Sequence, residues 1–418
     1  MDRSFITGLV HSPGFVRIVV FLGVMGPGLI TGLADDDAAG IATYSLAGSQ
    51  FGYAMLWTFI PMTIALSVIQ EMGVRMGIVT GKGLAALIRE KAGVRMTFFI
   101  MMALLAANFG TTLAEFAGIS ASASILGIPI FISMPLSVLF LMWLVIKGSY
   151  KSVERVFLFA SVLYLSYIVS GFLAHPDWKA AAISTVVPQI SFTRAYLLML
   201  IGLVGTTISP WMQFYIQSSV AEKEVPSARL GYSRLDAVSG SIVSNLVAWF
   251  IVVACAATIF TNGIQVNDVV DVSKALVPLA GNYASILFAV GFLNASLFAA
   301  SILPLTTSYA VCGGLGLERG VSKTLREAPV FFGLYAGTII LSALIISLPN
   351  VPLLSILFIS QVFLGILLPF VLIYVLLIIN DKNVMGEHVN TRSYNYIAWA
   401  TVIITIGLST ALIITQFL

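Results

Sequence analysis

Three consecutive acids are the clearest chemical signal in this sequence. Asp35, Asp36 and Asp37 lie in the middle of the apolar segment FLGVMGPGLITGLADDDAAGIATYSLAGSQFGY. One acid at the centre of a membrane helix costs about 2.5–3.5 kcal/mol by the lower estimates, so three in a row need cations, water or backbone groups as partners. They could cap a helix that starts after them, because a helix N-terminus favours negative charge. One carboxylate suffices for a cap, and the run therefore favours a cation-binding site.

A second interrupted segment offers neutral oxygen ligands. In YLLMLIGLVGTTISPWMQFYIQSS, the pair Thr206-Thr207 is followed by Ser209 and Pro210. Irregular backbone at membrane depth is tolerated only where it lines a cavity or is buried in protein. Hydroxyls and freed carbonyls without His, Cys or Met favour hard cations. Met212 lies on the half-helix that continues past the break, and we interpret it as a packing residue.

Three further polar positions lie in apolar segments. Glu115 could carry a proton or could form hydrogen bonds with neighbouring hydroxyls, and the sequence favours neither. Gln361 could reach a central ion through its side-chain carbonyl, although satisfaction by backbone groups is the more ordinary interpretation. Glu71 and Arg75 are four residues apart, and the spacing predicts an ion pair on one helix near the membrane surface.

The composition indicates a protein that lies mostly in a bilayer. Of the 418 residues, 59% are apolar and only 9% are charged, whereas soluble domains carry roughly 25% charged residues. A net charge of +3, without a basic run interleaved with aromatics, argues against nucleic acid as a partner. Cys255 and Cys312 both lie in apolar stretches, which predicts small core residues rather than disulfides or a thiolate metal cluster. We expect no removable signal peptide at the N-terminus.

Eleven segments are long enough to cross the hydrocarbon, for which about 20 apolar residues are needed. They are 17–50, 54–74, 97–121, 130–147, 155–174, 194–219, 237–260, 281–313, 329–348, 352–379 and 395–417. With residues 1–16 in the cytoplasm, all Lys and Arg except Lys179, Arg194 and Lys274 fall on the cytoplasmic side. Because Lys and Arg are retained in cytoplasmic loops, we predict a cytoplasmic N-terminus and an extracytoplasmic C-terminus in the plasma (inner) membrane.

The two interrupted segments are the first and the sixth, so the sixth enters the membrane from the opposite side. Residues 17–174 and 194–379 can then form two inverted repeats of five helices, with 395–418 as an added eleventh helix. Paired broken helices in inverted halves are the best sequence pointer to the central site of a transporter. We therefore predict an all-α membrane protein of this architecture.

At these residues the chain resembles the natural-resistance-associated macrophage protein (NRAMP) family of divalent-metal transporters. Several motifs occur in the family order: GPG at 26–28, AT at 42–43, FGY at 51–53 with Leu56-Trp57, VTGK at 79–82, LAE at 113–115, SQV at 360–362, LPF at 368–370 and Met385-Gly386. The resemblance implies a leucine-transporter-like fold that carries divalent cations, usually together with protons.

The departures from the family pattern are equally informative. Where the family has Asp-Pro-Gly-Asn, this chain has DAAG at 37–40, so the Asp is kept and Gly40 replaces Asn. Where the family has Met-Pro-His, this chain has SPW at 209–211, which removes the soft thioether and the imidazole associated with proton coupling. The acid usually found three residues before Glu115 is Thr112. In these losses the chain resembles the NRAMP-related magnesium transporters.

This resemblance implies a transporter of Mg²⁺, and also of Mn²⁺, rather than an enzyme, with the ion as substrate and no cofactor. Mg²⁺ keeps several waters and is usually held by one or two carboxylates. A divalent ion gains about 4.6 kcal/mol per 100 mV of inside-negative potential, so proton coupling is unnecessary. The candidate metal-site residues are Asp36, Asp37, Ala34, Gly40, Thr206, Ser209 and Gln361, with Glu115 as a candidate proton-path residue.

Other functions remain as alternatives. The nearest is a proton-coupled Mn²⁺/Fe²⁺ carrier of the ordinary NRAMP type. A Na⁺-coupled amino-acid carrier with the same fold ranks lower, because three carboxylates repel an anionic substrate group. An intramembrane aspartyl protease needs two acids on separate helices, whereas the three acids here are adjacent on one segment. A zinc enzyme lacks ligands, because His11, His175 and His388 lie in loops or at the N-terminus. We expect the bilayer and a divalent ion as partners; the sequence does not define the oligomeric state, and a monomer is compatible with it.

Overall fold

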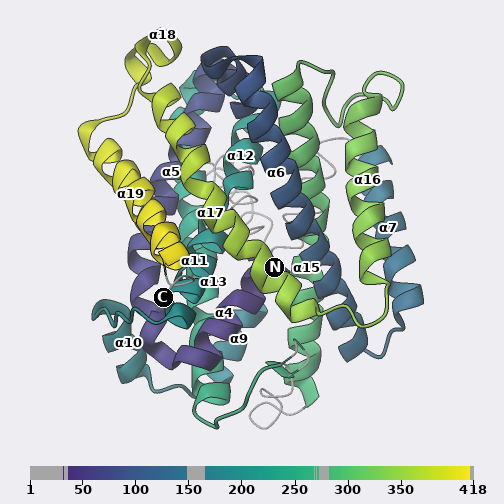
Figure 1. Cartoon of the computed structure of the whole chain (residues 1–418), viewed down its shortest axis with the longest axis vertical. Helices are drawn as coiled ribbons and strands as arrows, with labels where there is room; N and C mark the ends of the chain where they lie inside the picture. Colours follow the sequence, from purple (N-terminus) through teal and green to yellow (C-terminus); the bar gives the residue numbers. More distant parts are fainter. Residues whose placement is uncertain are drawn as a thin grey trace, which may run out of the picture.

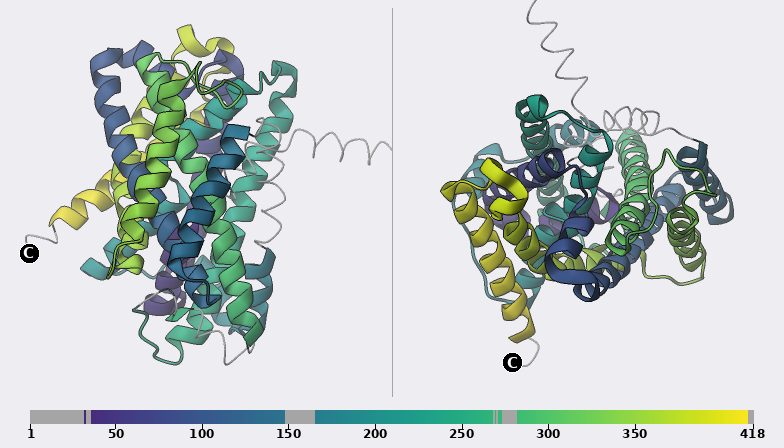
Figure 2. Two further views of the ribbon diagram at one scale, coloured as in Figure 1. Left: turned by 90° about the vertical axis from the view of Figure 1, so that its right-hand side faces the viewer. Right: turned by 90° about the horizontal axis from the view of Figure 1, so that it is seen from above.

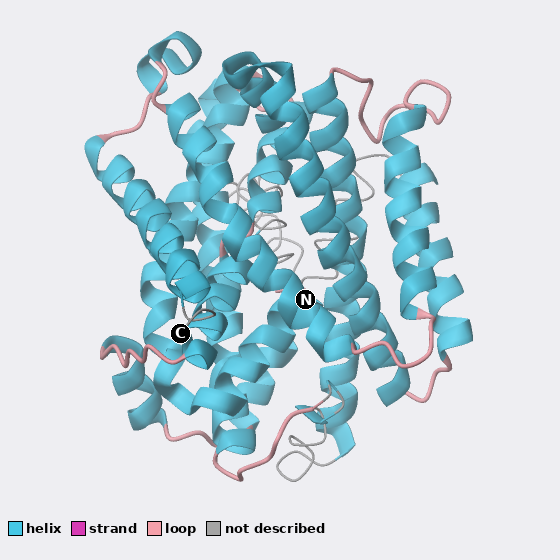
Figure 3. Ribbon diagram, viewed as in Figure 1, coloured by secondary structure: helices cyan, strands magenta, loops and turns pink. Residues whose placement is uncertain are grey.

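A computed structural model of the protein describes residues 32, 36–147, 165–267, 269, 271–272 and 282–414. Within these ranges all regular secondary structure is helical (Figure 3). Apolar chains in a bilayer form helices because every backbone N–H and C=O must be satisfied within the segment. Eight helical stretches of the described residues are long and apolar enough to cross a membrane.

The first half of the chain begins, in its described part, with the helix that follows the acids. Its elements are α4 (Ala38–Phe51), the 3-10 turn η1 (Gly52–Thr58), α5 (Phe59–Thr80), α6 (Leu84–Ile125), α7 (Ile130–Lys147) and α9 (Leu165–Leu173). The predicted segments 17–50 and 155–174 fall partly outside the described residues. A short helix that hydropathy does not predict, α10 (Trp178–Val186), follows.

The second half begins with the predicted broken helix. Its elements are α11 (Arg194–Thr207), α12 (Pro210–Glu222), η3 (Ser227–Arg229), α13 (Leu230–Cys255), the π-helical turn η4 (Ala256–Phe260), α15 (Asn282–Leu315), α16 (Pro329–Ile346), α17 (Leu353–Ile379), α18 (Lys382–Met385), η5 (Gly386–His388) and α19 (Arg392–Ile414). The interruption lies at Ile208 and Ser209, where the sequence predicts it.

Some helices extend well beyond the predicted apolar segments. The helix α6 begins at Leu84 rather than near residue 97, because a charged helical segment that includes Arg89 and Lys91 precedes the apolar stretch. At Gly93 the backbone has φ 77° and ψ 167°, so two helical pieces meet at a kink that a glycine accommodates. Hydropathy detects the apolar part of a helix and not its polar extension.

Tight packing at small residues brings the two halves together. The helix α6 packs against α15 and α17, α11 packs against α17 and α4, and α13 packs against α4 and α5 (Figure 1). A Cβ at Gly205 of α11 would clash with the carbonyl of Gln361, and one at Gly118 of α6 would clash with Ala38 and Ser296. Such small residues let membrane helices approach closely, and here they surround the start of α4 and the end of α11.

The outer helices lie at opposite edges of the molecule. The helices α7 and α16 pack together at one edge, while α19 leans outward at the other and packs against α5, α11 and α17 (Figures 1 and 2). Cys255 and Cys312 are free and buried, as predicted.

Candidate metal site

The N-terminus of α4 is held by two carboxylates from different parts of the chain. Asp37 has extended backbone and is the N-cap; its Oδ1 accepts a hydrogen bond from the Gly40 N–H at 2.5 Å. Glu115, on α6, accepts a hydrogen bond from the Ala38 N–H at 3.1 Å through Oε2. The first N–H groups of a helix have no partner within it, and the positive end of the helix dipole attracts negative charge. The capping interpretation of the acidic run is therefore correct for Asp37, and Glu115 bonds to backbone rather than to hydroxyls.

Capping leaves two carboxyl groups incompletely satisfied. Asp36 is 0% exposed, and neither of its oxygens accepts a hydrogen bond of normal length from the described residues, although the Ser244 side chain is nearby. The Oε1 atom of Glu115 is likewise buried without a partner there. Asp37 lies near enough to both acids for like charges to repel. Buried charges that are neither paired nor bonded are costly, so these carboxyl groups require a cation, water or a proton as a partner.

The second break lies between α11 and α12. Ser209 has extended backbone (φ −67°, ψ 136°) and Pro210 is the first residue of α12. The Ser209 hydroxyl donates to the carbonyls of Gly205 at 2.8 Å and Thr206 at 3.1 Å, so these carbonyls are not as free as the sequence led us to expect. The Thr207 hydroxyl lies 3.3 Å from the Tyr44 hydroxyl of α4, which joins the two half-helices directly.

Two neutral oxygens near this break have no partner among the described residues. They are the hydroxyl oxygen of Thr206 and Oε1 of Gln361, both buried. Among the described residues the Gln361 side chain donates only to the hydroxyl of Ser360, at 3.2 Å, so the expectation that backbone groups satisfy this residue was wrong. The close approach of Gly205 to the Gln361 carbonyl brings the last turn of α11 directly against α17.

The structure buries every candidate metal-site residue that it describes. These are Asp36, Asp37, Gly40, Thr206, Ser209 and Gln361, together with Glu115; Ala34 and Asp35 lie outside the described residues. Across the described part of the chain, no three or more His, Cys, Asp or Glu side chains gather to hold a metal. A site here would thus combine few carboxylates with neutral oxygens and water.

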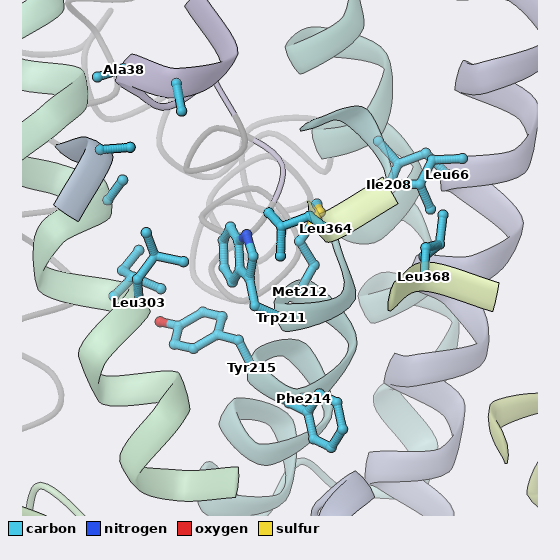
Figure 4. Packing of buried hydrophobic residues seen from close by; sticks show 14 of the residues in the cluster. Ala38, Leu66, Ile208, Trp211, Met212, Phe214, Tyr215, Leu303, Leu364 and Leu368 are labelled. Carbon is cyan, nitrogen blue, oxygen red and sulfur yellow. The ribbon is translucent and has the colours of Figure 1, made fainter. Parts of the chain in front are cut away.

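The side chains after the second break belong to the hydrophobic core. Trp211 and Met212 are 0% exposed, and Trp211 lies between Leu303 of α15 and Leu364 of α17 (Figure 4). Met212 is therefore a packing residue, as its position after the break indicates. Thr112, at the position of the missing acid, donates to the Asn108 carbonyl at 2.8 Å.

Three buried glutamines were missed in the sequence. Gln70 of α5 and Gln213 of α12 have side-chain amides without partners among the described residues, while Gln217 donates to the Lys82 carbonyl at 2.9 Å. Ser209, Gln213 and Gln217 are spaced by four residues and therefore share one face of α12. That spacing of polar residues in an apolar segment was the available signal.

Known proteins show the same sequence family and fold. The family model described as natural resistance-associated macrophage protein-like matches residues 28–415. A divalent metal cation transporter MntH of Deinococcus radiodurans is 28% identical over 415 residues, which cover 96% of this chain and 91% of that protein. The MntH of Ralstonia nicotianae is 31% identical, with 90% and 86% covered.

Solved structures agree with the helical arrangement. A manganese transporter of Eremococcus coleocola superposes with a TM-score of 0.76 at 21% identity, covering 95% of this chain and 87% of that one. The nucleobase-cation symporter Mhp1 gives a TM-score of 0.55 at 15% identity, covering 94% of this chain and 93% of that one. The fold is therefore the leucine-transporter-like arrangement of two inverted repeats, in a multi-pass membrane protein. The chain belongs to the Nramp family, a family of divalent-metal transporters and not of enzymes, in which the metal ion is substrate rather than cofactor.

Proposed function

We propose that this protein transports Mg²⁺, and also Mn²⁺, through a site between the break before α4 and the break between α11 and α12. The observation that carries the proposal is the set of buried oxygens without partners among the described residues. They are both carboxylate oxygens of Asp36, Oε1 of Glu115, the Thr206 hydroxyl and Oε1 of Gln361. Asp37, at the N-cap of α4, lies beside Asp36 and Glu115 and would be the direct or water-mediated ligand. An all-oxygen set suits a hard cation.

The ion would keep part of its hydration shell. Mg²⁺ dehydrates reluctantly and is usually bound through one or two carboxylates and retained waters. Gly40 and Ser209 are small where the resembled family pattern has Asn and Met, which leaves room for water. The unpartnered amides of Gln70 and Gln213 are suited to hydrogen-bonding such waters along the face of α12 that leads away from the break.

Membrane potential would drive uptake. A divalent ion that enters a cell with an inside-negative potential gains about 4.6 kcal/mol per 100 mV. The positions that carry His and a second acid in the family pattern are Trp211 and Thr112 here, and neither titrates near neutral pH. Rocking of one repeat bundle against the other would expose the site alternately to the two sides.

Flux into proteoliposomes tests this function. Protein reconstituted with a K⁺ diffusion potential should take up Mg²⁺ and Mn²⁺ at rates that rise as the lumen becomes more negative. Liposomes with Asp37→Asn, which keeps a capping oxygen but removes the charge, serve as the matched control. Uptake of Mn²⁺ without Mg²⁺ would contradict the proposed substrate.

Proton-coupled Mn²⁺ transport is the second candidate, because the relatives include MntH proteins and a manganese transporter and because Glu115, the candidate proton-path residue, lies beside Asp37. A pH-sensitive dye in the lumen separates the two mechanisms. We expect no metal-dependent acidification. Acidification that scales with metal uptake and disappears in Glu115→Gln would establish the coupled mechanism instead.

A further inference from the structure

An apolar cavity of about 480 Å³ lies between α5, α11 and α19, on the outer side of α11 and lined by none of the candidate metal-site residues. Its walls include Ala65 of α5, Leu200 of α11, Ile208 directly after α11, and Ala400 and Leu408 of α19. All three helices belong to stretches long and apolar enough to cross a membrane. The cavity volume is within the range of about 300–1,000 Å³ that holds small ligands in proteins.

The hydroxyls that line this cavity already have partners. Thr58 donates to the Met55 carbonyl at 2.7 Å, and Thr401 donates to the Ile397 carbonyl at 2.9 Å. Thr405 donates to the Thr401 carbonyl at 2.9 Å. The cavity therefore offers an apolar surface with no spare hydrogen-bonding group from these threonines, and it suits a hydrocarbon chain rather than water or a polar solute.

One end of the cavity has the features of a membrane interface. The Trp57 indole N–H donates to the Tyr196 hydroxyl at 3.2 Å, and Tyr196 donates to the Gln189 carbonyl at 2.5 Å. Trp and Tyr are enriched where the hydrocarbon meets the headgroups. Arg194, the first residue of α11, is exposed and does not line the cavity itself, and it forms no ion pair within the described part of the chain. A guanidinium is a strong phosphate-binding group.

We infer that this cavity binds one phospholipid, with an acyl chain between α11 and α19 and the phosphate at Arg194. The chain contacts Val204 and Ile208, so it ends against the residues that directly precede the broken backbone at Ser209. The bound lipid thus supports the end of α11 from the side opposite to α17. The occupant is a phospholipid rather than free phosphate, because the apolar cavity supplies most of the contact surface.

Native mass spectrometry tests this inference. The purified full-length protein is washed with detergent and phosphatidylglycerol is added before the measurement. Ala400→Trp fills the cavity from its exposed rim, and Ile403→Trp places the same bulk on α19 outside the cavity. We expect one retained lipid in the wild-type protein and in Ile403→Trp. Retention should fall about tenfold in Ala400→Trp, equivalent to about 1.4 kcal/mol of binding free energy.

A second pair of variants tests the contact between Arg194 and the lipid phosphate. Arg194→Gln should lower lipid retention severalfold, whereas Lys179→Gln, at another basic residue predicted on the same side, should not. Inorganic phosphate should not displace the lipid. Equal retention in Ala400→Trp and Ile403→Trp, or equal loss in both, would overturn the site, and unchanged retention in Arg194→Gln would overturn the assigned headgroup contact.

Discussion

Two regions of this protein bury acidic side chains, and they treat them in opposite ways. Glu71 of α5 is 1% exposed and lies 2.9 Å from the Arg75 guanidinium and 2.6 Å from that of Arg234 on α13. Arg75 also donates to the carbonyls of His388 at 2.8 Å and Val389 at 3.1 Å. Asp36, equally buried, has no such cation among the described residues.

The difference separates an acid with a structural role from one that we propose serves transport. Glu71 has permanent partners on two helices, so its charge is compensated whether or not an ion is bound. Among the described residues, the acids before α4 have only backbone N–H groups and each other, and under the proposed function a transported cation compensates their charge. A buried acid without a permanent cation in a membrane protein is a candidate functional site, and the proposed function assigns this one to the transported ion.

The largest expected effect is on transport at the break. Asp37→Asn should abolish Mg²⁺ and Mn²⁺ uptake while leaving the melting temperature close to that of the wild-type protein, because Asn is as good an N-cap as Asp. Asp37→Ala should also abolish uptake and lose about 1 kcal/mol of stability with the cap. Proteoliposome flux and thermal unfolding measure the two effects. Normal uptake in either variant would remove Asp37 from the site.

Replacing Glu71, the acid paired with arginines, should change the stability of the protein, whereas replacing Asp36 should not lower it. Glu71→Gln should lower the free energy of unfolding by about 3–5 kcal/mol, because it leaves Arg75 buried without its carboxylate partner. Asp36→Asn should leave stability unchanged or raise it, since it removes an uncompensated buried charge. Thermal unfolding of both variants in the same detergent, without divalent ions, provides the comparison. A larger loss in Asp36→Asn than in Glu71→Gln would contradict this account of the two regions.

Ion selectivity should change by a smaller amount. Ser209→Met combined with Gly40→Asn introduces a thioether and an amide and should shift the uptake ratio severalfold toward Mn²⁺, because soft donors favour transition metals. Ser209→Ala is the matched control, since it loses the same hydrogen bonds to Gly205 and Thr206 without adding sulfur. An unchanged Mg²⁺/Mn²⁺ ratio in the double variant would place selectivity elsewhere.

The smallest effect is expected at an exposed ion pair. Lys91 of α6 binds Asp381 at the N-cap of α18, and this ammonium lowers the pKa of Asp381 below its usual value. A lowered pKa stabilises the folded protein above the unfolded pKa of about 3.9, and the contribution is lost as the pH falls through the folded value. Lys91→Gln should lower the melting temperature slightly at neutral pH and not at all in strong acid. A loss as large as that in Glu71→Gln would contradict the distinction between exposed and buried pairs.

Much of this arrangement follows from sequence patterns with a direct physical meaning. Long apolar runs predict the helices, and Thr206 to Pro210 predict the second break, because proline and small polar residues end a helix at depth. The ion pair of Glu71 with Arg75 follows from their spacing. Both side chains are buried, because Arg234 and the segment before α19 cover them.

The remaining features depend on packing between distant segments. Nothing local to Glu115 indicates that it binds the Ala38 N–H of another helix, or that Tyr44 meets Thr207. Ser209 satisfies carbonyls that we expected to be free, because its hydroxyl donates to carbonyls in the last turn of α11. The role of Gln361 and the cavity beside α19 likewise depend on which helices lie side by side, which hydropathy does not determine.

The central claim is that the buried acids before α4 bind a divalent cation. Calorimetric titration of Mg²⁺ into the purified protein tests this claim most directly. The wild-type protein should bind Mg²⁺, Mn²⁺ should compete for the same site, and Asp37→Asn should show no binding while remaining folded. Binding of Mg²⁺ that persists in folded Asp37→Asn, or the absence of Mg²⁺ binding in a wild-type protein that binds Mn²⁺, would contradict the account.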